Sequence, residues 1–145
     1  MSPVIHHSAL VVSDLERSVS FYRRFFGAEV EMSFETGGPD VAALHGLSEP
    51  CVFTMAMLRV DGGRIELFEF KEPADRQVAI ARACDIGGTH LAFQVDDVRV
   101  MYEELCRNHV QFTRPPLVVG EEGPVLAFCL DPDGHRIELV ELPTE

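Results

Sequence analysis

Tryptophan is absent from this sequence of 145 residues, and lysine occurs once, as Lys71. The 12 lysine and arginine residues are outnumbered by 24 aspartate and glutamate residues, so the formal net charge is −12. This balance disfavours nucleic acid and anionic membrane surfaces as partners, because both bind to clustered basic side chains. We therefore expect no nucleic acid and no membrane among the partners of this protein.

Long hydrophobic runs are also absent, and no stretch approaches the roughly 20 apolar residues that span a bilayer. Residues 1–7 lack the basic start and the apolar stretch of a signal peptide. The four cysteines are widely spaced, without a C-x-x-C motif. These features predict a cytoplasmic protein with buried, reduced thiols, and the 46% hydrophobic content predicts one globular domain.

An internal repeat is the main feature of the sequence. The tetrapeptide Arg-Ile-Glu-Leu occurs at residues 64–67 and again at 136–139, each time after a turn that contains glycine. Upstream, residues 7–15 resemble residues 90–98, with His, Ala, Val and Asp at matching places. Because both pairs occur in the same order, the sequence predicts a duplicated structural unit.

Each copy predicts the order strand, helix, strand, strand, strand. In the first copy the strands are expected at 4–12, 28–33, 52–60 and 64–70, and the helix at 15–26. In the second copy the strands are expected at 89–95, 110–113, 124–130 and 135–142, and the helix at 98–108. About eleven extra residues in the first copy are expected to form a loop within 34–50.

The predicted fold class is α+β, with two βαβββ modules forming a curled mixed sheet around a metal-binding cavity. We expect a single domain over residues 1–145, with module one at about 1–72 and module two at about 87–145. The linker between them, at about 73–86, has some helical character.

Four residues stand out through their place in the repeat. Side chains alternate along a strand, so each repeated glutamate faces away from its neighbouring isoleucine and leucine. If the two sheets curl together, these glutamates and the histidines that begin the upstream segments converge on one site. Imidazole and carboxylate ligands suit Zn, Ni, Co, Mn or Fe. The candidate ligands of a divalent metal ion are His7, Glu66, His90 and Glu138.

Each of these residues has an ordinary structural interpretation when it is taken singly. A glutamate in such a strand usually faces solvent, and a histidine at a strand start is seldom a ligand. Their ordered recurrence favours the metal site. His6 could replace His7, but the alignment with His90 favours His7.

Other polar residues are expected to have structural roles. Glu69 and Glu141 fall on the Ile/Leu side of their strands, and we expect them at sheet edges or in ion pairs. We expect Asp14, Asp97 and Asp131 to cap helices or form turns. Surface positions are expected for His45, His109 and His135.

At these motifs the sequence resembles the vicinal oxygen chelate superfamily, which includes glyoxalase I, methylmalonyl-CoA epimerase, extradiol dioxygenases and the fosfomycin and bleomycin resistance proteins. The matching segments are residues 7–22, 64–67, 88–97 and 131–139. The resemblance implies paired βαβββ modules and a divalent metal held at the four positions named above. It also implies a small-molecule substrate and a homodimer.

A glutamate at both repeated positions is similar to the ligand set of glyoxalase I. The resemblance therefore implies a glyoxalase-like lyase or isomerase that acts on a small carbonyl compound through a metal-bound enediolate. Glu66 or Glu138 would be the catalytic base, and the repeat does not distinguish them. Val11 stands where glyoxalase I carries an arginine that holds glutathione, so a glutathione adduct is not the expected substrate.

Two alternatives stay open at this point. His7, His90 and Glu138 alone match the three ligands of an Fe(II)-dependent extradiol-type dioxygenase. The chain could also be a drug-binding resistance protein without catalysis. Such proteins generally lack the complete ligand set, whereas this sequence retains all four positions.

Overall fold

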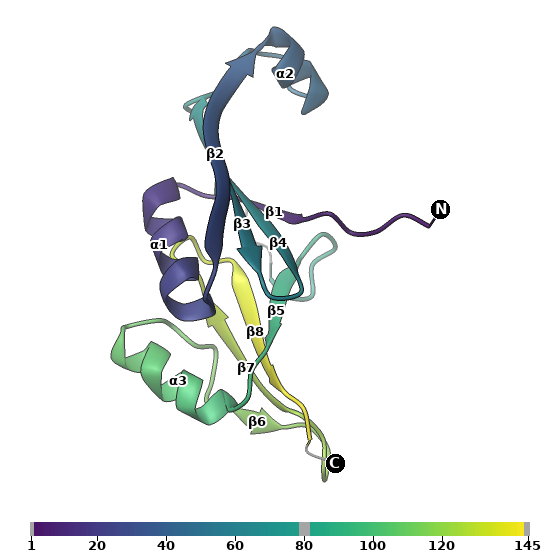
Figure 1. Ribbon diagram of the computed structural model, residues 1–145, viewed down its shortest axis with the longest axis vertical. Helices are drawn as coiled ribbons and strands as arrows, with labels where there is room; N and C mark the ends of the chain where they lie inside the picture. The colour runs from purple at the N-terminus through teal and green to yellow at the C-terminus, as the bar shows by residue number, and fades with distance from the viewer. Residues whose placement is uncertain (1, 79–81, 144–145) are drawn as a thin grey trace. The chain divides into compact units, whose positions relative to one another are not determined.

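The computed structural model describes residues 2–78 and 82–143. The chain divides into two compact units, Met1–Val78 and Ala79–Glu145. Each unit has one four-stranded mixed sheet (Figure 1), and both follow the order strand, helix, strand, strand, strand. The predicted α+β class with two βαβββ modules is confirmed.

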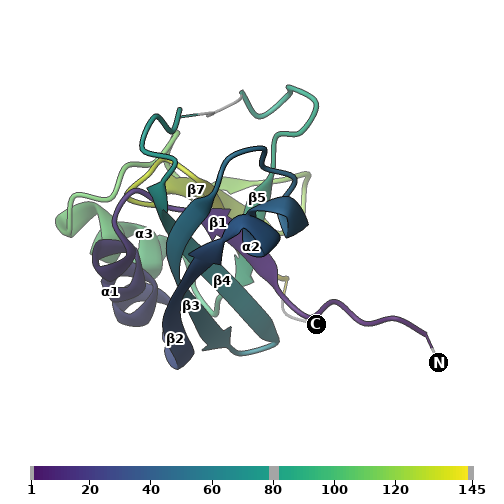
Figure 2. The ribbon, with the colours of Figure 1, turned by 90° about the horizontal axis from the view of Figure 1, so that it is seen from above.

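In the first unit the strand order across the sheet is β1-β4-β3-β2, with β1 parallel to β4 and the other neighbours antiparallel. The two helices lie on opposite sides of this sheet (Figure 2). The elements are β1 (Ser8–Val11), α1 (Leu15–Phe26), β2 (Glu29–Gly38), α2 (Pro39–Leu44), β3 (Cys51–Val60) and β4 (Gly63–Glu72).

The second unit repeats this arrangement with the strand order β5-β8-β7-β6. Again the first strand is parallel to the last, and the remaining pairs are antiparallel. Its elements are β5 (His90–Gln94), α3 (Val98–Arg107), β6 (Leu117–Val118), β7 (Val125–Leu130) and β8 (Arg136–Glu141).

The core of each unit lies between its long helix and one face of its sheet. Ile65 and Leu67 are buried on the side of β4 that α1 covers, and Tyr22 of that helix is completely buried. In the second unit Ile137 and Leu139 are buried under α3 in the same way. The alternation of the repeated tetrapeptide therefore directs its glutamate to the side of each sheet opposite its long helix. We call these two sides the Glu66 face and the Glu138 face.

Aspartates cap both long helices, as the sequence predicts. The Asp14 carboxylate accepts the backbone N–H of Arg17 at 2.9 Å, and the Asp97 carboxylate accepts that of Val100 at 2.9 Å. These bonds satisfy N–H groups that have no partner within the helix, which fixes where α1 and α3 begin.

Glutamates from the last strand of each unit also hold the helix starts. The Glu69 carboxylate accepts the backbone N–H of Leu15 at 2.7 Å, and the Glu141 carboxylate accepts that of Val98 at 2.9 Å. Both therefore lie on the Ile/Leu side of their strands, as expected, but they accept backbone N–H groups of the helices in place of the sheet-edge or ion-pair roles expected for them. A carboxylate there also favourably meets the positive end of the helix dipole.

The extra residues of the first copy are ordered rather than a loop. The strand β2 continues to Gly38, and α2 follows with a proline at its first position (Figure 1). Sequence periodicity does not reveal α2, because a helix of 6 residues is shorter than two turns.

Two predicted strands differ in extent. The strand expected at 110–113 contributes only an isolated bridge between Phe112 and Cys129, and pairing resumes at β6 after Pro115 and Pro116. Proline lacks the N–H that a ladder needs, so the strand is interrupted there. The first strand begins at Ser8 rather than at residue 4, because β4 begins only at Gly63.

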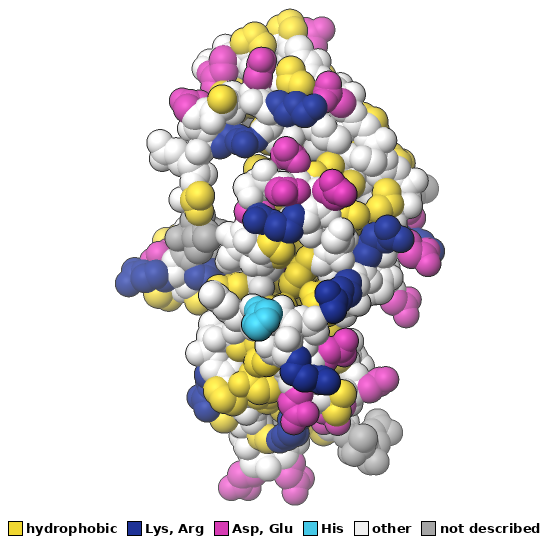
Figure 3. All heavy atoms as spheres, turned by 90° about the vertical axis from the view of Figure 1, so that its left-hand side faces the viewer, with side chains coloured by type: hydrophobic (Ala, Val, Ile, Leu, Met, Phe, Trp, Pro, Cys, Tyr) yellow, Lys and Arg dark blue, Asp and Glu magenta, His cyan; other side chains and the backbone are white. Residues whose placement is uncertain are grey.

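In the linker, residues 73–78 and 82–86 contain no helix, and residues 79–81 lie outside the described part of the chain. None of the described helices is long and apolar enough to cross a membrane. On the face that Figure 3 shows, acidic and basic side chains are interspersed and form no continuous basic area.

Candidate metal-binding site

The first candidate half-site joins the start of β1 to the middle of β4. Ala9 pairs with Glu66 across the parallel strands, and His7 lies two positions before Ala9, immediately before β1. The His7 Nε2 atom is 2.8 Å from Oε2 of Glu66. The Glu66 side chain is only 13% exposed, whereas that of His7 is 34% exposed. His7, and not His6, makes this contact with the glutamate.

The second candidate half-site repeats this geometry in the other unit. Ala92 pairs with Glu138 across β5 and β8, and His90 lies two positions before Ala92. The His90 Nε2 atom is 3.2 Å from Oε2 of Glu138. The register that joins histidine to glutamate is the same in both units, so the repeat in sequence is a repeat of side-chain geometry.

The structure thus arranges the four candidate ligands as two His–Glu pairs, one in each unit. Within either unit, the described residues contain no group of three or more His, Cys, Asp and Glu side chains suited to a metal ion. A single unit therefore offers two ligands, fewer than the three or four protein ligands that bind a transition metal in most enzymes.

The chemistry of each pair fits a divalent cation. An imidazole nitrogen and a carboxylate oxygen, the donors that Zn, Ni, Co, Mn and Fe accept, face each other at hydrogen-bond distance. Both carboxylates are mostly removed from solvent, where a charge needs a counter-charge. A divalent cation bound to both atoms of a pair would supply this counter-charge.

Aromatic contacts support the histidine of the second pair. Phe128 of β7 lies directly across from Glu138, and its ring meets the His90 ring edge-on at a centroid distance of 5.4 Å. In the first unit the position across from Glu66 is Met57, and His7 instead contacts His6, with their Nδ1 atoms 2.7 Å apart. Sequence reasoning missed the role of Phe128, because the β7–β8 register is set by tertiary structure.

The turn before β8 contains a buried acid paired with a histidine. The Asp131 side chain is fully buried and accepts the backbone N–H groups of Asp133 and His135, both at 2.9 Å. It also lies 2.9 Å from Nδ1 of His135, which is half-buried and not on the surface as predicted. The turn role expected for Asp131 is confirmed.

This pairing shifts the pKa values of both groups. The hydrogen bond to Asp131 raises the pKa of His135 above its ordinary value, although burial opposes the change. Burial raises the pKa of Asp131, but the bonds from His135 and from two backbone N–H groups outweigh it, so the pKa is lowered. The charged pair fixes the turn from which the Glu138 strand begins.

The cysteines do not add to the candidate site. All four are free thiols, and Cys51 and Cys129 are buried whereas Cys84 and Cys106 are exposed, which corrects the expectation that all are buried. Burial raises the pKa of Cys129 to about 12, so it remains a protonated thiol. It pairs with Ile137 and therefore lies on the side opposite Glu138.

The chain is similar in sequence to known enzymes. The chain is 30% identical to a 2-epi-5-epi-valiolone epimerase of Actinomyces sp, over 96% of this chain and 79% of that protein. It is 28% identical to a lactoylglutathione lyase of Haemophilus influenzae, over 94% of this chain and 91% of that protein.

A solved structure shows the same fold. The chain superimposes on a glyoxalase family protein of Bacillus cereus with a TM-score of 0.83 and 24% identity, over 97% of this chain and 94% of that protein. The sequence profile of one family also matches residues 4–139, which include all four candidate ligands. The chain belongs to the Glyoxalase/Bleomycin resistance protein/Dioxygenase superfamily.

Proposed function

We propose that this protein is a metal-dependent, glyoxalase-like lyase or isomerase that acts on a small carbonyl compound. The observation that carries the proposal is the recurrence of one His–Glu pair, in the same register, in both units. Relatives that include an epimerase and lactoylglutathione lyases support the reaction class.

In this proposal the metal ligands are His7, Glu66, His90 and Glu138. Because transition metals in enzymes need more than two protein ligands, one ion would use both kinds of His–Glu pair, from one chain or from two. When bound, a divalent cation, such as Zn, Ni, Co, Mn or Fe, supplies the positive charge that stabilises an enediolate.

The chain supplies the proton transfer. Glu66 or Glu138 takes the proton from the carbon next to the substrate carbonyl onto a carboxylate oxygen. The electrons of that C–H bond form the carbon–carbon double bond of the enediolate. Return of a proton to the opposite face of the same carbon gives an epimer. Delivery of the proton to the neighbouring carbon, with loss of the hydroxyl proton from the first carbon, makes the first carbon the new carbonyl and gives an isomer.

Equivalent geometry at both glutamates favours four ligands over the three of an extradiol-type dioxygenase. Glu66 contacts its histidine as closely as Glu138 does, so nothing sets Glu66 apart as a residue outside the ligand set. Retention of both pairs likewise favours an enzyme over a drug-binding protein without catalysis.

We further propose that the protein forms a homodimer. Apolar side chains on the edge strand β2 support this, because Met32 is 51% and Phe34 is 49% exposed. Exposed apolar residues on a sheet edge commonly mark an interface. A sedimentation measurement that gives the mass of one chain would contradict it.

Solvent deuterium exchange tests the proposed reaction. Protein loaded with Ni, Co, Zn or Mn is incubated with hydroxyacetone or dihydroxyacetone in D2O, and loss of the α-proton signal is followed by NMR. We expect exchange that stops on chelation and that falls by at least about 100-fold in the variant Glu66→Gln or Glu138→Gln, whichever glutamate is the base. Lack of metal binding, or Fe(II)-dependent oxygen uptake with catechol, would overturn the proposal.

A further inference from the structure

The Glu66 face is strongly aromatic at one end. Phe68 and Phe70 follow Glu66 on the same side of β4, because side chains alternate. Across the antiparallel register, Met55 pairs with Phe68 and Phe53 pairs with Phe70. The three phenylalanine rings meet at centroid distances of 5.0 to 6.1 Å. Phe68 is the next residue after the candidate ligand Glu66 on this side of β4.

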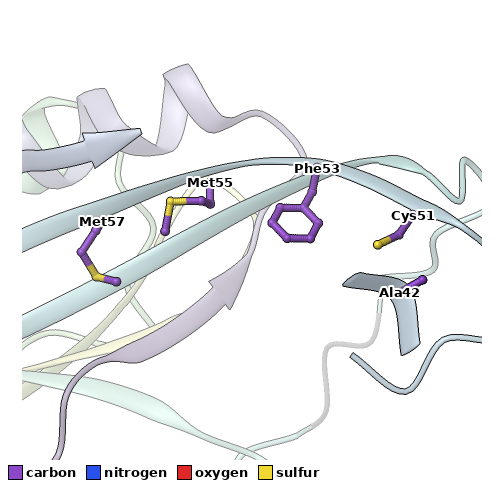
Figure 4. Packing of buried hydrophobic residues seen from close by; sticks show 5 residues of the cluster. All are labelled: Ala42, Cys51, Phe53, Met55 and Met57. Atoms are coloured by element: carbon purple, nitrogen blue, oxygen red, sulfur yellow. The ribbon is translucent and has the colours of Figure 1, made fainter. Parts of the chain in front are cut away.

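The helix α2 covers part of this end. Ala42 of α2 packs in a cluster with Cys51, Phe53, Met55 and Met57, which lie in a row on one side of β3 (Figure 4). Phe68 and Phe70 are partly buried against this cluster and remain partly open to solvent.

His45, at the C-terminal end of α2, lies against all three rings. Its ring meets those of Phe53, Phe68 and Phe70 nearly edge-on, with centroids 5.3, 5.8 and 6.2 Å away. His45 is exposed, and its side chain has no hydrogen bond or ion pair to any residue that the structure describes. The ring nitrogens of an exposed imidazole beside an aromatic surface are available to a ligand.

Two arginines lie on the Glu66 face at the end opposite to the aromatic cluster, and each forms an ion pair with a glutamate. Arg59 forms an ion pair with Glu29, and Arg64 Nε is 2.7 Å from Glu31. At the aromatic end, Val11 pairs with Phe68 and is 54% exposed, which extends the apolar surface. Such a surface suits an uncharged group, and apart from the His45 ring it offers a carboxylate or phosphate no hydrogen-bond donor or positive charge.

The described residues of the second unit contain no equivalent of this aromatic cluster. The repeat places Val140 and Leu142 where the first unit has Phe68 and Phe70. It also lacks the segment that forms α2 and carries His45. The cluster is therefore an addition to one half of a duplicated site and is not required by the fold.

We propose that His45, Phe68 and Phe70 bind an uncharged aromatic or hydrocarbon substituent of the substrate, next to its metal-binding oxygens. This inference rests on the proposed metal site and names the substrate class that it would accept. His45 is then a specificity-determining residue that contacts the substituent and takes no part in the proton transfer.

Two hydroxamates test this without the need for a known substrate. Acetohydroxamate and benzohydroxamate bind a metal through the same two oxygens and differ only in a methyl or a phenyl substituent. Calorimetric titration of the full-length, metal-loaded protein gives both association constants. Their ratio, compared between wild type and variants, cancels the intrinsic affinity of each compound for the metal.

We expect the ratio of the association constant of benzohydroxamate to that of acetohydroxamate to fall by about tenfold in His45→Ala. The phenyl group would lose most of the side-chain surface that it contacts. A smaller decrease, of about threefold, is expected for Phe70→Leu, which installs the residue found at the repeated position. The matched control is Leu44→Ala, since Leu44 is the preceding residue and is 84% exposed. It should leave the ratio unchanged, and none of the three variants should change metal affinity.

The outcomes separate this inference from the proposed function. If both hydroxamates bind and the ratio is the same in wild type and His45→Ala, the assignment of His45 is wrong and the metal site stands. If neither compound binds better to metal-loaded than to metal-free wild type, the metal site fails and this inference fails with it.

Discussion

The strand position opposite the glutamate holds Met57 in the first unit and Phe128 in the second. The same His–Glu geometry is thus held by different surroundings, with His90 against an aromatic ring and His7 against another histidine. The units also differ on the candidate ligand face, because α2, His45 and the phenylalanine cluster belong to the first unit and have no counterpart in residues 82–143. What recurs is the His–Glu pair and the anchoring of the long helix.

This comparison separates the features that both halves share from the features that one half has alone. A feature that both halves keep in the same register serves the fold or a cation that binds to both His–Glu pairs. A feature present in one half is free to respond to the substrate, which does not share the pseudo-symmetry of the protein. The aromatic end of the Glu66 face belongs to the second kind.

Removal of either histidine gives the largest expected effect and tests whether the two halves are equivalent. We expect His7→Ala and His90→Ala each to weaken binding of Zn or Ni by at least about 100-fold, because each removes one of four ligands. Competition with a chromogenic chelator measures the affinity, and wild type should bind about one ion per chain.

His6→Ala is the matched control for this comparison, since His6 is the exposed neighbour of His7 and has no contact with Glu66. It should weaken metal affinity by about tenfold at most, the low end of what loss of an outer partner of a ligand costs, because the His6 Nδ1 atom lies 2.7 Å from Nδ1 of His7. Affinity that survives in His90→Ala and disappears in His7→Ala would show that the units are not equivalent and that the four-ligand site is wrong.

The next effect concerns the anchoring of the helices. Glu69→Ala and Glu141→Ala should each lower the free energy of unfolding by roughly 2 kcal/mol, because a partly buried bond to a charged acceptor is lost. Gln at either position keeps an acceptor oxygen and should lower the free energy of unfolding by about half as much. Urea denaturation followed by circular dichroism measures both, since the chain has no tryptophan for fluorescence.

Glu122→Ala, an exposed loop variant, is the control for the loss of a negative charge. On a chain of net charge −12, removal of any acidic residue slightly reduces repulsion, so the control separates this general effect from the bond. If Glu69→Ala were no less stable than Glu122→Ala, the bond to the Leu15 N–H would not contribute to stability.

Much of the fold could be predicted from the sequence because its signals are local and occur twice. The caps Asp14 and Asp97 and the alternation in the repeated tetrapeptide act within a few residues, and the structure has them as expected. The roles of Glu69 and Glu141 depend on helix residues 54 and 43 positions away in sequence, which alternation along one strand does not reveal. The helix α2 is too short to produce a periodic signal.

The candidate site was predicted in part for the same reason. The repeat identified His7 with Glu66 and His90 with Glu138, and the structure brings the members of each pair together. It did not identify His45, because that residue lies in the one segment without a counterpart and its aromatic neighbours come from other strands. A repeat indicates what two halves share and cannot indicate what only one contains.

The smallest expected effect is a pH dependence of the free energy of unfolding, which should come from the Asp131–His135 pair of the second unit. Folding raises the pKa of His135, so its contribution is complete below the unfolded value of about 6.5 and is lost as pH rises through the folded value. Folding lowers the pKa of Asp131, so its contribution is present above about pH 4 and is lost as pH falls through the folded value. The pair therefore stabilises most between about pH 4 and 6.5.

His135→Gln should accordingly be less stable than wild type by about 1 kcal/mol near pH 5.5, with a smaller difference at pH 9, in urea denaturation at both pH values. The control is His109→Asn, because His109 is exposed and has a φ of 62°, which asparagine tolerates. The corresponding turn of the first unit, at Asp61 and Gly62, contains no histidine, so this pH dependence should come from one unit alone. A stability difference that is constant from pH 5.5 to pH 9 would mean that the charged pair does not hold the turn before the Glu138 strand.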